Sequence, residues 1–142
     1  FSGSGTTAAV AAKLGRRFLV CDASPVAMQL LRARQLVSQS EPTFFDGGQA
    51  LRILYDHPPY GDLTPQVALQ DTEEGIIRIV YHGAGEQRLA YLAAGERNQD
   101  GLFCPRSYAL SPTPGTVITL PHLPNACLQA CNYAGQMAFF KL

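Results

Sequence analysis

The chain is 142 residues long and 46% of its residues are apolar, which suits one ordinary domain, or one domain with part of another. Eleven basic residues balance eleven acidic ones, and no run of about 18 apolar residues is long enough to span a membrane or form a secretory signal. The apolar content excludes disorder, collagen and coiled coil, so we expect a neutral, soluble protein that does not enter a membrane.

The charge is nonetheless unevenly distributed. Residues 1–38 contain five basic residues and one acidic residue, whereas the remainder contains six basic and ten acidic residues. A nucleic-acid-binding face usually carries a dense basic stripe, which is absent here. The basic excess is therefore typical of solvated helix flanks and gives only weak support for DNA binding.

The first predicted elements are a glycine-containing loop and a helix. Gly3 and Gly5 lie in the loop, where the missing Cβ lets backbone N–H groups approach a ligand at the positive end of the helix. The alanine-rich run 8–14 has high helix propensity, and Gly15 fits the C′ position just beyond a helix end. We therefore expect a loop that leads into a helix ending near Gly15.

A buried strand and a second helix are predicted next. Residues 18–21 form a short apolar run that ends at Asp22, as in a parallel strand. Ser24 and Pro25 fit the N-cap and first position of a helix. Apolar residues then recur at i, i+4, i+7 and i+11, at Val26, Leu30, Ala33 and Val37.

The loop and the acid that ends the strand together indicate an adenosine site. The loop can accommodate the polar tail of a nucleoside, and Asp22 can accept hydrogen bonds from both ribose hydroxyls. The spacing Gly3-x-Gly5-x-x-Ala8 fits a nicotinamide dinucleotide equally well. On these residues alone, both cofactors remain open.

A longer pattern points to one family. Residues 1–7 read Phe-Ser-Gly-Ser-Gly-Thr-Thr, residues 15–17 read Gly-Arg-Arg, and residues 22–25 read Asp-Ala-Ser-Pro. This string closely resembles the segment that follows the target-recognition region in S-adenosylmethionine-dependent DNA methyltransferases of the amino-methylating type, which modify adenine N6 or cytosine N4. The resemblance covers residues 1–37, a quarter of the chain.

The resemblance implies that residues 1–38 are the C-terminal part of an α/β cofactor-binding domain, a partial Rossmann-like methyltransferase half with the order helix-strand-helix. The strand pattern of the later residues, described below, predicts a small β-rich domain after it. The resemblance implies S-adenosylmethionine as the cofactor. The residues expected to bind it are Phe1, Gly3, Ser4, Gly5, Thr6, Thr7, Asp22, Ala23 and Ser24. In the structural alternative, Thr6 and Thr7 only cap a helix and Asp22 only ends a strand.

The resemblance also implies that the chain is the C-terminal portion of a longer cytoplasmic enzyme. In members with this loop, a strand ending in Asp-Pro and the catalytic Asp/Asn/Ser-Pro-Pro-Tyr tetrapeptide lie upstream of it. We therefore expect this portion to be a poor catalyst, with its catalytic residues unknown. Its expected partners are DNA, bound through the full-length protein, and an upstream catalytic segment or a second copy of the chain.

Residues 56–61 contain a second Pro-Pro-Tyr string, Asp-His-Pro-Pro-Tyr-Gly. In the family, the polar residue before Pro-Pro accepts hydrogens from the flipped base and the aromatic ring stacks on it. Here that residue is His57, which departs from the pattern, and the string lies downstream of the loop. A proline-rich turn is the favoured interpretation.

Histidines and cysteines show no clear site pattern. His57, His82 and His122 are dispersed and are expected to be turn or surface residues. Two of the four cysteines, Cys127 and Cys131, are four residues apart and so share one face of a strand or helix. Buried reduced thiols are favoured for the four, with a disulfide or metal site left open.

The rest of the chain is predicted to be a linker, residues 39–48, and a β-rich domain, residues 49–142. Strands are expected at 76–81, 116–120, 126–130 and 138–142, with a turn at 132–136, while 89–93 fits a strand or a short helix. This spacing favours a small antiparallel sandwich or sheet, and the last hairpin faintly resembles that of fibronectin-like modules.

Two other functions remain open. The chain could be a non-catalytic binding or assembly module whose methyltransferase-like start is a relic, or a fragment of a nicotinamide-dependent dehydrogenase. The sequence does not distinguish adenine from cytosine as a target, nor does it fix the oligomeric state.

Overall fold

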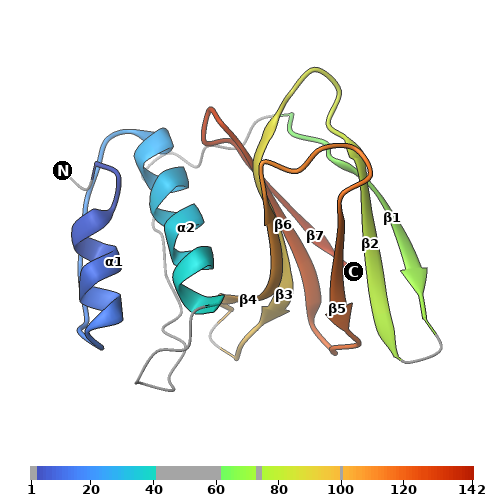
Figure 1. Ribbon diagram of the computed structural model, residues 1–142, viewed down its shortest axis with the longest axis horizontal. Coiled ribbons are helices and arrows are strands. Elements are labelled where there is room, and N and C mark those ends of the chain that lie inside the picture. The colour runs from blue at the N-terminus through green and yellow to red at the C-terminus, as the bar shows by residue number, and fades with distance from the viewer. Residues whose placement is uncertain (1–2, 41–61, 73–74, 100) are drawn as a thin grey trace.

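The structure, a computed structural model, describes residues 3–40, 62–72, 75–99 and 101–142. Within these ranges two helices come first and seven strands follow, so the described chain mixes helix with antiparallel sheet. The two helices lie side by side next to one of the two sheets (Figure 1). The expected linker begins too early by two residues, because the second helix continues to Ser40; its remainder, 41–48, lies outside the described residues.

The first helix, α1, spans Thr6–Lys13 and ends as the sequence predicts. Gly15 has a φ of 65°, and its N–H donates to the Ala12 carbonyl at 3.0 Å. The Arg16 N–H donates to the Ala11 carbonyl at 2.9 Å, which completes a Schellman motif. The predicted C′ glycine is therefore confirmed.

The second helix, α2, spans Pro25–Ser40, as the Ser-Pro pair predicts, but its buried face is not the predicted one. The apolar stripe is largely exposed: Val26 and Leu30 are each 41% accessible and Val37 is 38% accessible. The opposite side of the helix is buried. It carries Ala27, Met28, Gln29, Leu31, Arg32, Gln35 and Leu36.

The expected strand at 18–21 is not formed. Residues 16–22 run extended between the helices, with Phe18 and Val20 packed against the helical cluster and Leu19 98% exposed. A strand needs a neighbour for its backbone hydrogen bonds, and none of the seven strands pairs with this segment. The side chains of the segment therefore alternate as in a strand, but its backbone forms no hydrogen bonds to a neighbouring strand of either sheet.

The seven strands form two antiparallel sheets, with orders β1-β2-β5 and β4-β3-β6-β7. Their bounds are β1 Gln66–Asp71, β2 Ile76–Gly83, β3 Leu89–Arg97, β4 Phe103–Leu110, β5 Val117–Pro121, β6 Ala126–Asn132 and β7 Met137–Lys141. The strands predicted near residues 76, 116, 126 and 138 are confirmed, and 89–93 is strand rather than helix. Strands β1 and β4 were not predicted.

The sheets pack face to face, which confirms the sandwich expectation. Ile79 and Leu120 of the first sheet and Leu92 and Leu128 of the second are fully buried in one cluster. In β2, buried and exposed side chains alternate along the strand, as expected where one face meets a core. Each sheet therefore has an inner face in this core and an outer face turned away from it.

The outer face of the four-stranded sheet carries a second cluster. Tyr91 and Ala93 of β3 and Cys127 and Cys131 of β6 are buried there, and Leu36 of α2 packs on them. Helix α2 also contacts β3 and β4 directly. The helical part is thus attached to the sandwich through the outer face of this sheet.

Candidate functional site

The glycine loop and Asp22, the two ends of the predicted adenosine site, are in direct contact. The Gly3 N–H donates to Asp22 Oδ2 at 2.8 Å, and the Ser24 N–H donates to Asp22 Oδ1 at 3.0 Å. One carboxylate therefore joins the loop before α1 to the turn before α2, across 19 residues of sequence.

Hydroxyl groups form hydrogen bonds where the loop enters α1. Ser4 Oγ and Thr6 Oγ1 lie 3.1 Å apart, and the Arg34 guanidinium donates to Thr6 Oγ1 at 3.2 Å. Arg34 belongs to α2, so this bond is a second link between the loop and that helix. Ser4, Thr6 and Thr7 are exposed, as residues that contact a ligand at the surface must be.

The start of α1 has polar N–H groups without a side-chain cap. Its N-cap residue, Gly5, adopts a left-handed conformation with φ 74°, and no side-chain oxygen accepts from the first turn. A Cβ at this position would lie 2.7 Å from Leu31 Cδ1, so Gly5 is required by packing against α2. At Gly3, by contrast, a Cβ would meet nothing within 4 Å, which leaves open space beside the loop.

The structure thus brings together most of the predicted cofactor residues. Ala23 and Ser24 are exposed next to Asp22, which is half-buried. Phe1 lies outside the described residues, as does the Pro-Pro-Tyr string with His57. Among the described residues, no group of side chains suited to catalysis lies next to the loop.

The remaining histidines are surface residues. His82 is exposed on β2, and His122 lies 3.2 Å from Asp71 Oδ1 with both side chains largely exposed. Across residues 3–40, 62–72, 75–99 and 101–142, no three His, Cys, Asp or Glu side chains are grouped so that they could hold a metal ion. Over the same ranges, no helix is long and apolar enough to cross a membrane.

All four cysteines are free thiols, but only Cys127 and Cys131 are buried as expected; Cys21 is exposed and Cys104 is half-buried. Burial raises the pKa of Cys131 to about 12. Burial also raises the pKa of Cys127, against the opposing charge of Arg97. Both buried groups therefore stay as neutral thiols near neutral pH.

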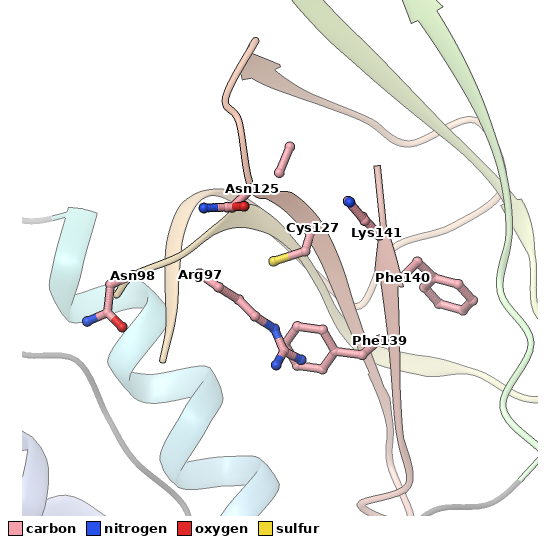
Figure 2. A pocket seen from close by; sticks show the side chains of 8 residues that line it. Arg97, Asn98, Asn125, Cys127, Phe139, Phe140 and Lys141 are labelled. Carbon is pink, nitrogen blue, oxygen red and sulfur yellow. The ribbon is translucent and has the colours of Figure 1, made fainter. Parts of the chain in front are cut away.

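A pocket of about 430 Å³ that was not predicted from the sequence lies at one end of the four-stranded sheet. Arg97, Cys127, Phe139 and Lys141 line it, and Figure 2 shows the Arg97 guanidinium lying over the Phe139 ring. These residues come from β3, β6 and β7, so no local spacing in the sequence could have indicated the pocket. The strand register alone places Cys127 opposite Lys141.

Comparison with known proteins finds no match for this chain, whether among protein-family models, curated proteins or solved structures.

Proposed function

We propose that this chain is the C-terminal part of an S-adenosylmethionine-dependent DNA methyltransferase that acts on an exocyclic amine of adenine or cytosine. The loop before α1 and Asp22 would form its adenosyl site. The hydrogen bond from the Gly3 N–H to Asp22 carries the proposal, because it brings the glycine loop and the carboxylate side by side, as an adenosyl site requires. S-adenosylmethionine, when bound, supplies a methyl group on a positively charged sulfur.

The chemistry of the loop residues fits such a ligand. Asp22 places a carboxylate beside the loop, and a carboxylate at this place is the group that accepts hydrogen bonds from ribose hydroxyls in adenosine sites. The first-turn N–H groups of α1 have no side-chain cap, so they can receive the carboxylate of the methionine part. The open space beside Gly3 admits a ligand against the backbone.

The packing of the helical part supports membership in a larger α/β unit. The apolar stripe of α2 is exposed, whereas Gln29, Arg32 and Gln35 are buried. Leu19, in the extended segment, is almost fully exposed. Exposed apolar side chains of this kind suit contact with an upstream segment of the protein. The same segment would contribute the catalytic tetrapeptide. The chain alone would therefore catalyse poorly.

A second candidate function is a non-catalytic docking module. The observation that favours it is that Asp22 already holds the loop to the start of α2 through two backbone N–H groups. A carboxylate with that structural role needs no ligand. In this case the exposed apolar side chains would bind a partner protein and the loop would bind no nucleoside.

Calorimetric titration with S-adenosylhomocysteine distinguishes the two candidates. We expect saturable heat with the unaltered chain and at least about tenfold weaker binding by Asp22→Ala, since a hydrogen bond to a charged group contributes about 1.5–3 kcal/mol. Asp62→Ala, which changes an exposed carboxylate outside the loop, is the matched control and should bind normally. Circular dichroism shows whether each variant is folded.

The other outcomes reject the methyltransferase proposal. Absence of heat with the folded, unaltered chain would favour the docking module. Heat with NAD but not with S-adenosylhomocysteine would favour a dehydrogenase fragment. Equal binding by the Asp22 and Asp62 variants would show that the ligand lies elsewhere on the chain.

A further inference from the structure

The pocket on the sandwich has a positive rim. Arg97 ends β3 and Lys141 ends β7, and both side chains are exposed at the pocket of about 430 Å³. No carboxylate is among the described residues that line the pocket, and neither cation forms an ion pair with a described residue. The nearby Glu96 is engaged by Arg106, with a distance of 2.6 Å between Arg106 Nη2 and Glu96 Oε1. Among the described residues, no carboxylate therefore neutralises these two cations.

Arg97 is held in place before any ligand arrives. Its guanidinium carbon lies 4.4 Å from the centroid of the Phe139 ring, a cation–π geometry. Phe139 is in turn fixed edge-to-face by Phe103, with centroids 5.4 Å apart and planes at 88°. A guanidinium stacked on a fixed ring loses less entropy when it forms a bidentate bond to an anion.

Between the two cations, the described lining of the pocket is uncharged and combines apolar with polar groups. Cys127 pairs with Lys141 across β6 and β7, and its sulfur points toward Arg97 in Figure 2. Because burial raises the pKa of this thiol, it remains protonated near neutral pH and does not cancel the charge of Arg97. Phe139 and Ala126 add apolar surface, whereas Asn98 and Asn125 add amide groups at the rim.

From this arrangement we infer that the pocket binds a small organic anion. A carboxylate or phosphate group would lie between Arg97 and Lys141, and a planar, apolar body would lie against Phe139 and Cys127. The volume falls within the range of about 300–1,000 Å³ found for small-molecule sites. Arginine and lysine are the side chains that bind such groups by charge-assisted hydrogen bonds. None of these residues belongs to the proposed cofactor loop.

The test uses phenyl phosphate and benzoate as probes, with benzyl alcohol and benzylammonium as uncharged and cationic controls of similar shape. Two-dimensional amide NMR spectra of the full chain would record the titrations. We expect both anions to shift the amides of Cys127, Phe139 and Lys141, and the controls to leave them unchanged. Inorganic phosphate should bind at least about tenfold more weakly than phenyl phosphate, because it lacks the apolar body.

Three variants assign the binding to the pocket. Arg97→Ala and Lys141→Ala should each weaken phenyl phosphate at least about tenfold, and Arg97→Lys should weaken it less, since it keeps the charge but not the planar fork. Arg78→Ala is the matched control: it removes an exposed arginine on β2, in the other sheet and outside the pocket, and should bind normally. The unshifted remainder of each spectrum shows that the variant is folded.

Several results would overturn the inference. If benzyl alcohol binds as tightly as phenyl phosphate, the negative charge of the ligand does not contribute to binding. If inorganic phosphate binds as tightly as phenyl phosphate, the planar apolar part of the ligand does not contribute to binding. Duplex DNA binding that Arg97→Ala abolishes, without any binding of phenyl phosphate, would make the pocket a contact for DNA phosphates instead. If the unaltered chain binds phenyl phosphate but not S-adenosylhomocysteine, the methyltransferase proposal is rejected and the inference about the pocket is not.

Discussion

The sandwich and the helical part differ in how completely they bury their apolar side chains. Ile79, Leu92 and Leu128 are fully buried between the two sheets. In the helical part, the described cluster between α1 and α2 holds only Ala8, Ala27, Met28 and Leu31 at its centre. Several large apolar side chains there are exposed: Val10, Leu14, Leu19, Val26, Leu30 and Val37. The sandwich therefore completes its own core, whereas the helical part is suited to further neighbours.

This difference predicts where stability resides. The sandwich should unfold as one cooperative unit, and the helical part should open locally at lower free energy. Substitutions in the two regions can therefore test the comparison directly.

The largest effect is expected for Leu128→Ala. This side chain is fully buried between the sheets, so the variant should lose about 3–4 kcal/mol of unfolding free energy in a urea titration. Leu110→Ala is the control, since Leu110 is 43% exposed on the edge strand β4, and it should change stability little. A loss below about 1 kcal/mol for Leu128→Ala would contradict a self-sufficient sandwich core.

Gly95→Ala should lose about 3 kcal/mol. A Cβ on Gly95 would collide with the Cys104 carbonyl oxygen and lie 2.8 Å from Pro105 Cα, both in the neighbouring strand. The control is Gly85→Ala, where φ is +61° but nothing lies within 4 Å of the added Cβ, so only the left-handed backbone is strained, by about 1 kcal/mol. Similar losses in the two variants would contradict a close approach of β3 and β4.

Leu31→Ala should have a local effect of about 2 kcal/mol. Leu31 lies between α1 and α2 and contacts neither sheet cluster. Hydrogen exchange should therefore accelerate at amides of residues 6–36 and stay unchanged in β3 and β6. Equal acceleration in the strands would show that the helices and the sandwich unfold together, which would contradict local opening of the helical part.

A smaller effect is expected from pH at Cys131. Burial raises its pKa to about 12 from an ordinary value of 9.0, so the folded state holds the proton that the unfolded state releases. The stabilising contribution is complete below pH 9, and the free energy of unfolding should fall by about 1.4 kcal/mol per pH unit above it. Urea titrations at pH 8.5 and 10.5 measure this slope.

The controls for the pH experiment are two cysteine variants. Cys131→Ala should lose the part of the slope that Cys131 contributes and keep the part due to Cys127, whose pKa burial also raises. Cys21→Ala, at an exposed position, should keep the whole slope. Identical slopes in all three proteins would show that Cys131 is not protected from solvent.

The smallest effect is expected for Leu19→Ser. With 98% of its surface exposed, Leu19 contributes no core packing, so stability should change by less than about 0.5 kcal/mol. A larger, concentration-dependent loss would show that a second copy of the chain covers the extended segment. That result would identify the second copy as the neighbour that covers this segment.

Local chemistry in the sequence determined the helix ends and most strands. Gly15 and the Ser24–Pro25 pair fix helix boundaries because they act through the backbone of adjacent residues. Alternation in β2 is likewise a local signal. Strand β4 was missed because Pro105 argues against a strand; β4 tolerates it as an edge strand whose register shifts opposite Gly95.

The tertiary structure alone decided which faces are buried and where the pocket lies. Periodicity shows that α2 is a helix, but not which neighbours it meets, so the apolar stripe was a poor guide to its buried side. Asp22 could be linked with the glycine loop from the sequence, because both belong to one short segment. Arg97, Cys127 and Lys141 could not be linked, because only the pairing of β3, β6 and β7 brings them together. Long-range pairing depends on the whole chain, and so do the sites it creates.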